Sequence, residues 1–250
     1  TVVVAGGPHV SGVKEAALSE CGHFDFGVVG EGEETFALIL RALREGRKVL
    51  GLPGTMSRDG GGAIVRASPR PFIRDLDTLP FPAWDLLPGF PKRYEANLFF
   101  SPGGPSATLV TSRGCPFHCA FCDQSTFGNE YRAFSPEYVF RAARTLQRDY
   151  GVRYLVFCDD TFTVNRSRVL KICELLSTLR PKVAWSCDAN VMTVDREMLR
   201  AMRRAGCWSV SFGLESGSRE VLASLDKDID LVRAAEVIRW TSAEGIRPNG

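Results

Sequence analysis

Three cysteines within eight residues form the clearest chemical pattern in this sequence. Cys115, Cys119 and Cys122 are spaced C-x3-C-x2-C within the stretch TSRGCPFHCAFC, residues 111–122. Thiolates are soft ligands that suit an iron–sulfur cluster or zinc. Three thiolates on a four-iron cluster leave one iron open, and an open metal position is where a cofactor or substrate can bind. The spacing therefore favours a 4Fe-4S cluster that presents one iron to a small molecule.

A structural zinc site and simple packing are two other interpretations of the cysteine loop. A structural zinc site needs a fourth ligand and usually consists of two separated C-x2-C pairs, but no second pair occurs here. His118 stands between two of the cysteines, where its reach to a shared metal is poor. Cysteines that only pack would not be expected in a loop that contains Gly and Pro and follows a strand. Zinc and simple packing thus remain as alternatives that fit the pattern less well.

The bulk composition is that of a globular chain without a nucleic acid or membrane signature. The 250 residues are 44% hydrophobic and 24% charged, with a formal net charge of +2. This is enough for one large or two small domains, and the charge balance does not indicate nucleic acid as a partner. No apolar run approaches the ~18 residues of a membrane-spanning helix. The chain begins without Met and ends abruptly, so we expect a fragment at both ends.

The other cysteines of the sequence indicate in which cellular compartment the protein is expected. Five cysteines stand singly in the sequence, and a lone Cys in an apolar stretch is usually a small buried hydrophobe. The N-terminus has no basic segment of the kind that opens a signal peptide. A metal site is therefore favoured over a disulfide framework, and we expect a cytoplasmic location.

Residues 1–45 read as strand, helix, strand, helix. Buried strands are predicted at 1–5 and 26–29, a short helix at 13–20, and a second helix after residue 33. This pattern predicts the C-terminal part of a Rossmann-like domain. Glycine and proline crowd residues 46–105, which predicts a β-hairpin around Gly60–Gly62 and then a linker. The second helix is expected to carry Phe36, Ile39, Leu40 and Leu43 on one face.

From residue 106 to 250 strands and helices alternate. Strands are predicted at 107–111, 154–158, from 183 and at 208–214. The first helix is capped by Ser135, has Pro136 at its first position and ends at Gly151. Further helices follow each of the later strands, the last over 231–244. Such repeats predict an α/β fold with a parallel sheet and outer helices, a (β/α) barrel that is incomplete in this chain.

Polar residues follow the predicted strands at the edge that also carries the cysteine loop. The active sites of (β/α) barrels lie at the carboxyl ends of the strands, so these side chains are candidate site residues. An acidic pair could instead cap the next turn, and a carboxylate in such a loop could simply be solvated. The candidates are Asp159 and Asp160 after the second strand, Asp188 and Asn190 after the third, and Glu215 and Ser216 after the fourth.

The motif CPFHCAFC, with aromatic Phe121 just before the third cysteine, resembles the signature of the radical S-adenosylmethionine (radical SAM) superfamily. The resemblance covers residues 106–250 and implies that the three cysteines hold a 4Fe-4S cluster. It implies further that SAM binds the open iron through its amine and carboxylate. One electron from the reduced cluster would then cleave SAM to methionine and a 5′-deoxyadenosyl radical. An electron donor such as flavodoxin or ferredoxin is implied as a partner.

The same resemblance gives roles to the strand-end residues. The backbone at Asp159 and Asp160 would hold the methionine amine of SAM, and the stretch GLESGS, which contains Glu215 and Ser216, would lie along SAM. Many relatives carry an Arg near Asn190, so this chain departs from the family there. Lys227 matches a position where relatives also have a Lys, although a single Lys is more typical of a solvated surface.

The N-terminal residues resemble the end of the cobalamin-binding domain that precedes some radical SAM barrels. Gly6 and Gly7 follow the first strand, and the motif GEGE at 30–33 follows the second. In that subgroup the two glycines pack on the nucleotide tail of cobalamin, although a plain tight turn would also need glycine. Neither His9 nor His23 is a credible cobalt ligand. The subgroup therefore implies cobalamin as a third cofactor.

The function expected from this resemblance is radical hydrogen abstraction from a small-molecule substrate, followed by cobalamin-dependent methyl transfer. A cyclase resembling the anaerobic magnesium-protoporphyrin ester cyclase would use the same parts. Methylthiotransferases carry three further N-terminal cysteines, whereas only Cys21 precedes the loop here. A zinc-stabilised binding module is the non-enzymatic alternative. The sequence assigns neither the substrate nor a catalytic side chain.

Overall fold

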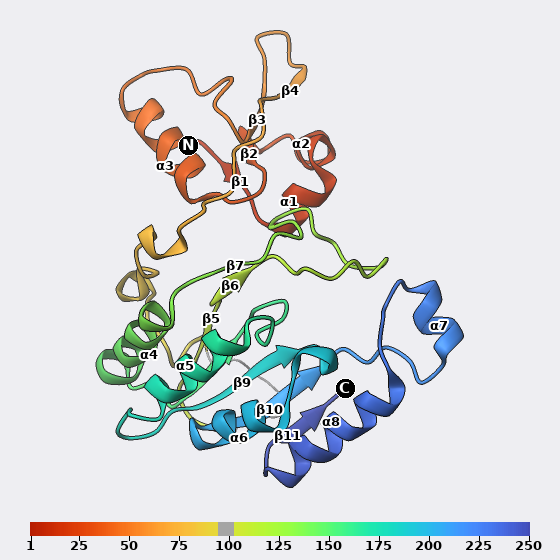
Figure 1. The fold of residues 1–250 in the computed structure, drawn as a ribbon. Helices are drawn as coiled ribbons and strands as arrows, with labels where there is room; N and C mark the ends of the chain where they lie inside the picture. Colours follow the sequence, from red (N-terminus) through yellow and green to blue (C-terminus); the bar gives the residue numbers. More distant parts are fainter. Residues whose placement is uncertain (95–102) are drawn as a thin grey trace. The chain divides into compact units, whose positions relative to one another are not determined.

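The computed structural model describes residues 1–94 and 103–250 and divides the chain into two compact units (Figure 1). The first unit is Thr1–Arg74 with Phe121–Glu130, and the second is Asp75–Ala120 with Tyr131–Gly250. Boundaries at 45 and 105 were expected from composition. They differ from these units because the hairpin pairs with the first sheet and because a segment after Ala120 returns to the first unit.

The first unit contains a four-stranded sheet in the order β1-β2-β3-β4. Strands β1 and β2 are parallel, as expected for buried strands joined by a helical segment, whereas β3 and β4 form the hairpin predicted around the glycines. Asp59 closes its turn by accepting hydrogen bonds from the amides of Gly61 and Ala63. The strands are β1 (Val4–Ala5), β2 (Phe26–Val28), β3 (Thr55–Arg58) and β4 (Ile64–Arg66).

Three helices accompany this sheet: α1 (Pro8–Val13), α2 (Glu15–Glu20) and α3 (Glu33–Arg44). The single helix expected over 13–20 is preceded by α1, and Lys14, at a φ of 52°, separates the two. Phe36, Ile39, Leu40 and Leu43 do lie at the i, i+3, i+4, i+7 positions of one face of α3, but only Ile39 is buried among them. The side of α3 that packs in the first unit is formed by Thr35, Ile39 and Ala42, and Phe36 is left 44% exposed.

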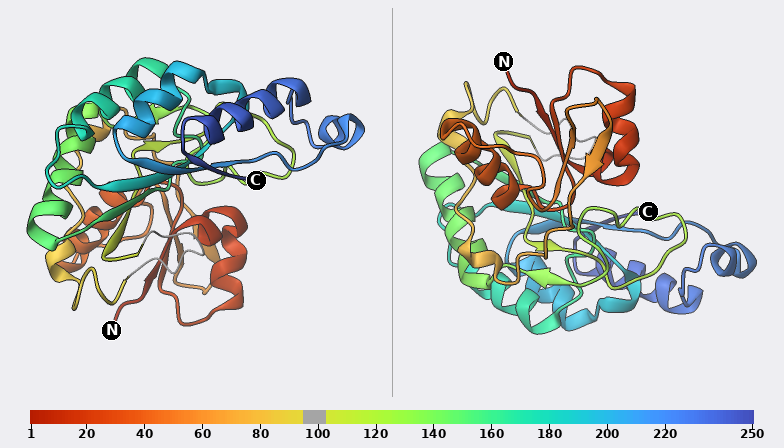
Figure 2. Two further views of the ribbon diagram at one scale, coloured as in Figure 1. Left: turned by 90° about the horizontal axis from the view of Figure 1, so that it is seen from below. Right: turned by 90° about the horizontal axis from the view of Figure 1, so that it is seen from above.

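The second unit contains a five-stranded parallel sheet in the order β11-β10-β9-β8-β5. Helices α4, α5, α6 and α8 lie along one face of this curved sheet (Figure 2). The strands are β5 (Ser106–Leu109), β8 (Tyr154–Phe157), β9 (Ala184–Ala189), β10 (Cys207–Phe212) and β11 (Arg247–Asn249). The helices are α4 (Pro136–Tyr150), α5 (Arg166–Leu176), α6 (Arg196–Arg204), α7 (Arg219–Ser224) and α8 (Leu231–Ala243), with 3-10 turns at Leu76–Thr78, Trp84–Leu86 and Val191–Thr193.

Local sequence signals place α4 as expected. Ser135 Oγ accepts a hydrogen bond from the Tyr138 amide at 3.0 Å, which satisfies one of the free donors of the first turn. Gly151 ends the helix at a φ of 69°, a left-handed conformation that glycine adopts without strain.

Alternation along the strands separates an apolar face from a polar one. In β9, Trp185 and Cys187 are buried, whereas Ser186 and Asp188 are partly or fully exposed. Buried side chains such as Leu155 and Val210 extend the same apolar layer across the neighbouring strands. Because successive side chains of a strand point to opposite faces, the face away from the apolar layer is left for polar contacts. No helix in the described part of the chain is long and apolar enough to cross a membrane.

Candidate active site

The cysteine loop begins and ends in a short antiparallel ribbon, β6 (Ser112–Arg113) and β7 (Arg132–Ala133). The Phe134 amide also donates to the Thr111 carbonyl at 3.0 Å. These contacts close the base of an 18-residue loop, 114–131, that contains all three cysteines. The sequence did not predict this ribbon, because two-residue strands separated by a long loop leave no periodic signal.

The three thiols of the loop are accessible and form no disulfide. Cys115 and Cys119 are partly exposed and belong to the second unit, whereas Cys122 is exposed and belongs to the segment that packs with the first unit. Cys115 Sγ lies 3.6 Å from Thr161 Oγ1, just beyond the end of β8. As described here, no three Cys, His, Asp or Glu side chains in residues 1–94 and 103–250 are grouped as metal ligands. The donor set itself, three thiols in one loop that form no disulfide, fits the chemistry of an iron–sulfur cluster.

Asp159 is buried beneath the loop base. Its carboxylate accepts hydrogen bonds from the amide and hydroxyl of Thr111 and, at 2.7 Å, from Ser112 Oγ. Burial raises the pKa of Asp159, while these hydrogen bonds and the nearby Arg168 oppose the shift. The carboxylate is therefore occupied inside the protein, and only the backbone of Asp159 is left to meet a ligand.

Arg168 holds both arms of the loop at their base. Its Nε donates to the Phe134 carbonyl at 2.8 Å and its Nη2 to the Thr111 carbonyl at 2.6 Å. The side chain is 7% exposed, so these bonds are shielded from water. Sequence reasoning missed this residue. One signal was present, since Arg168 shares the helical stripe of Ile172 and Leu176, where a charged residue must find partners inside.

The other strand-end candidates divide into exposed groups and turn-forming groups. Asp160 and Asp188 are exposed residues. Desolvation of its carboxyl group by the surrounding protein, together with the charge of Asp159, raises the pKa of Asp188, and a hydrogen bond from Ser211 opposes the shift. Asn190 caps the turn at 191–193 by accepting from the Met192 amide at 2.8 Å. Ser216 Oγ accepts from the Ser218 amide at 3.0 Å, just before α7.

Glu215 is held by a basic neighbour. Lys227 Nζ donates to its Oε1 at 2.8 Å, and Glu215 adopts a φ of 59°. A second contact joins this region to the cysteine loop, since the Ala120 amide donates to the Leu225 carbonyl at 2.9 Å. Phe121, which follows Ala120, is 54% exposed and belongs to the segment that packs with the first unit. Within the second unit, the structure thus links the cysteine loop to the ends of both β8 and β10.

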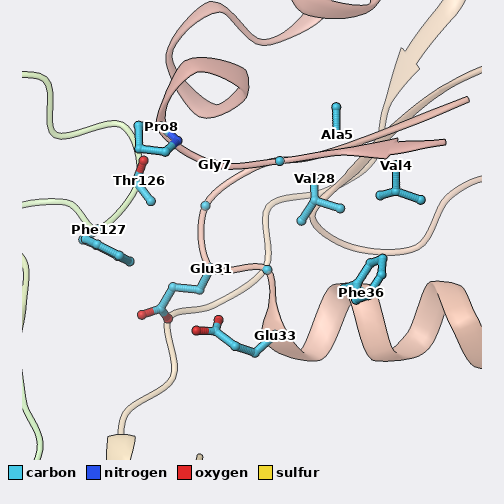
Figure 3. Close-up of a pocket in the computed structure, with 13 residues that line it drawn as sticks. Val4, Ala5, Gly7, Pro8, Val28, Glu31, Glu33, Phe36, Thr126 and Phe127 are labelled. Atoms are coloured by element: carbon cyan, nitrogen blue, oxygen red, sulfur yellow. The ribbon is translucent and has the colours of Figure 1, made fainter. Parts of the chain in front are cut away.

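A separate pocket of about 400 Å³ lies within the first unit, beside the ends of β1 and β2 (Figure 3). Gly7 has a φ of 96° and a ψ of −173°, a region that glycine adopts and other residues avoid. A Cβ at Gly6 would meet Val28 only at 3.7 Å, so neither glycine is required by crowding from the protein. Thr126 Oγ1 is buried without a hydrogen-bond partner in the described part of the chain. The lining is Val4, Ala5, Gly6, Gly7, Pro8, Val28, Gly30, Glu31, Gly32, Glu33, Phe36, Thr126 and Phe127.

The acidic residues around this pocket are tied to the protein. Glu31 is 5% exposed and accepts a hydrogen bond from the Ile73 amide at 2.7 Å. Glu33 begins α3, where a carboxylate complements the helix N-terminus. The pocket therefore offers mostly apolar surface and backbone at its glycine side, and one buried hydroxyl.

Comparison with known proteins gives a consistent result. Residues 109–249 match the family model of the radical SAM superfamily. The chain is 35% identical over 249 residues to an uncharacterized methyltransferase, PH0819, of Pyrococcus horikoshii, covering 99% of this chain and 52% of that protein. It is 30% identical to the anaerobic magnesium-protoporphyrin IX monomethyl ester cyclase of Cereibacter sphaeroides, and the match covers 94% of this chain and 39% of that protein. This chain thus spans about half of these relatives, or less.

Solved structures agree with the fold along nearly the whole chain. The cobalamin-dependent SAM radical enzyme OxsB with aqua-cobalamin bound superposes with a TM-score of 0.83 at 20% identity, covering 99% of this chain and 36% of that one. The radical SAM methyltransferase TsrM of Kitasatospora setae, with tryptophan and a SAM analogue bound, superposes with a TM-score of 0.76 at 17% identity. That match covers 99% of this chain and 48% of the TsrM chain. The α/β fold class predicted from the sequence is confirmed.

Proposed function

Because this chain belongs to the radical SAM superfamily, we propose that the complete protein cleaves SAM reductively and uses the resulting radical in a cobalamin-dependent methyl transfer to a small molecule. The observation that carries this proposal is the C-x3-C-x2-C loop, whose base is fixed to the ends of two adjacent parallel strands. Active sites of (β/α) barrels form at this edge. The loop and the strand ends are therefore suited to hold a cluster and its SAM together.

Different residues are proposed to bind the cluster and to support the cysteine loop. Cys115, Cys119 and Cys122 would hold a 4Fe-4S cluster, which supplies the electron that cleaves SAM. Asp159 and Arg168 keep the arms of the loop in place from below.

The strand ends would then position SAM. Backbone groups at Asp159 and Asp160 are proposed to meet its methionine part, and Glu215 and Ser216 to lie along the rest of the molecule. Asp188 and Asn190 would border the same side. Phe121, next to Cys122, is proposed to be a further cofactor-binding residue of the loop.

Cobalamin is proposed to bind through the pocket of the first unit. Open glycine backbone allows a bulky flat ligand to approach closely, and the Thr126 hydroxyl lacks a partner that such a ligand could supply. The fold match to a structure with aqua-cobalamin bound supports the same proposal. Gly6 and Gly7 are the residues of this chain assigned to that contact.

Replacing Gly6 with Leu in the full-length protein should lower bound cobalamin at least about tenfold, because the side chain would occupy space now open beside the strand end. Gly6 is preferable to Gly7, whose positive φ would add backbone strain to any substitution. The visible spectrum of cobalamin after gel filtration measures the effect.

Gly22→Leu is the matched control, because a side chain at Gly22 also meets open space but lies outside the pocket. Equal cobalamin content in Gly6→Leu and Gly22→Leu would contradict the assignment of the pocket.

Methyl transfer and cyclisation can be separated by the products of SAM. The names of the similar proteins include both a methyltransferase and a cyclase. Methyl transfer converts one SAM to S-adenosylhomocysteine and cleaves another to 5′-deoxyadenosine and methionine. A cyclase would release 5′-deoxyadenosine alone. Full-length protein, reconstituted anaerobically with iron, sulfide and cobalamin and then given SAM and a chemical reductant, should therefore produce both nucleosides, with reduced cobalamin as the acceptor of the methyl group that leaves S-adenosylhomocysteine. A protein that binds only zinc and produces neither would overturn the proposed function.

Two further expectations accompany the proposal. Reduction of the cluster calls for a small electron-transfer protein such as flavodoxin or ferredoxin. Oxygen-sensitive thiol chemistry suits a reducing compartment, which supports a cytoplasmic location.

A further inference from the structure

Lys227 is nearly buried and is committed to a carboxylate at the end of β10. Its side chain is 10% exposed, and Nζ lies 2.8 Å from Glu215 Oε1, whereas the Glu215 side chain is 35% exposed. A Lys is rarely buried without a paired charge, because desolvation of the ammonium is costly. Lys227 is therefore part of an ion pair at the strand end and is not a solvated surface lysine, one of the two interpretations left open by the sequence.

The backbone at the strand end is shaped around this pair. A Cβ at Gly213 would lie 2.9 Å from Lys227 Nζ and 3.0 Å from Glu215 Oε1, so the pair packs directly over the glycine. Glu215 itself has a φ of 59°, a conformation that residues other than glycine adopt only when their surroundings impose it. Both features restrict the direction in which the Glu215 carboxylate points.

The segment that supplies Lys227 also contacts the cysteine loop. The Leu225 carbonyl accepts from the Ala120 amide at 2.9 Å, and the Lys227 amide donates to the Leu222 carbonyl at 3.0 Å. The turn after α7 therefore touches both the loop that is proposed to hold the cluster and the residue that is proposed to meet SAM.

We propose that Lys227 is a positioning residue for SAM: it fixes Oε1 of Glu215, so that Oε2 accepts a hydrogen bond from a donor group of SAM. This inference rests on the proposed function. In the described part of the chain, Glu215 Oε2 accepts no hydrogen bond, which leaves it available. Holding the carboxylate in one orientation lowers the entropy lost when SAM binds.

The direction in which SAM affinity changes when Lys227 is removed distinguishes this positioning role from a simple charge effect. SAM carries a positive sulfonium, so removal of a nearby ammonium would by charge alone make SAM bind more tightly. If Lys227 instead orients Glu215, its removal makes SAM bind more weakly.

The test uses the full-length protein, reconstituted anaerobically, and measures the dissociation constant of radiolabelled SAM by equilibrium dialysis. Lys227→Met should weaken SAM binding by about tenfold, since a charge-assisted hydrogen bond then no longer orients the acceptor. Lys227→Arg should recover part of the loss. Lys171→Met is the matched control, because Lys171 forms an exposed ion pair with Glu174 and should leave the constant unchanged.

A double-mutant cycle with Glu215→Gln completes the test. If Lys227 acts through Glu215, the double variant binds SAM no more weakly than Glu215→Gln alone. Parent protein that binds SAM, together with a Lys227→Met variant that binds it equally or more tightly, overturns this inference and leaves the proposed function standing. Loss of iron in Lys227→Met also overturns it, because Lys227 would then support the loop. Parent protein that never binds SAM overturns the proposed function itself.

Discussion

Replacing Cys115, Cys119 or Cys122 with Ala is expected to abolish both the iron–sulfur cluster and the cleavage of SAM. Each thiolate is the only ligand that the chain provides for one iron in the proposed site, so no neighbour can substitute for it. The thiols of the loop are accessible and form no disulfide that a substitution would break. Iron, acid-labile sulfide and 5′-deoxyadenosine, measured after anaerobic reconstitution, should all fall to the background of the assays.

The other cysteines provide controls for this result. Cys173 is buried on α5, and its replacement by Ala should cost about 1 kcal/mol in packing while iron content stays the same. Cys158 is exposed after β8, so Cys158→Ala should also retain the cluster. SAM cleavage that survives in any variant of the three loop cysteines would refute the assignment.

Elements with a strong local signal could be predicted from the sequence. Ser135, Pro136 and Gly151 mark the ends of α4, because a side-chain cap, a fixed φ and a left-handed residue act within one turn of the chain. The parallel sheet followed from apolar runs that alternate with amphipathic helices. The cysteine spacing, a property of eight consecutive residues, could be recognised in the same way.

Features that depend on distant partners could not be predicted. Asp159 was predicted as a site residue at a strand end, but its carboxylate accepts hydrogen bonds from Thr111 and Ser112 on the neighbouring segment, a role that the sequence did not indicate. The burial of Thr35 in place of Phe36 depends on how α3 rotates against its sheet. Pairing of β3 with β2 also moves the hairpin into the first unit. In each case the deciding contact joins residues that lie tens of positions apart, which neither spacing nor periodicity encodes.

The second large effect is expected for Arg168→Met, which should destabilise the second unit by on the order of 3 kcal/mol and speed the loss of iron from the loop. The substitution keeps a long apolar side chain but removes the donors to the Thr111 and Phe134 carbonyls. It also removes the cation near the buried carboxylate of Asp159. The Phe134 carbonyl then loses its bond from Arg168, the Asp159 carboxylate loses the nearby cation, and the Thr111 carbonyl keeps only its bond from the Phe134 amide. Water cannot easily replace the guanidinium, because Arg168 is only 7% exposed.

Tryptophan fluorescence during urea unfolding of the cluster-free protein reports the free energy of unfolding of the second unit. The four tryptophans of this sequence, Trp84, Trp185, Trp208 and Trp240, all lie in that unit. Iron release to a chelator measures the effect on the loop.

Arg166→Met is the matched control. Arg166 lies two residues earlier on α5, where it pairs with Asp195 and Glu197 on the surface, and its loss should lower the free energy of unfolding by less than about 1 kcal/mol. Arg168→Lys should restore only part of the stability, because an ammonium lacks the fork that reaches two carbonyls at once. If Arg168→Met unfolds and releases iron as Arg166→Met does, the buried arginine is not what holds the base of the cysteine loop.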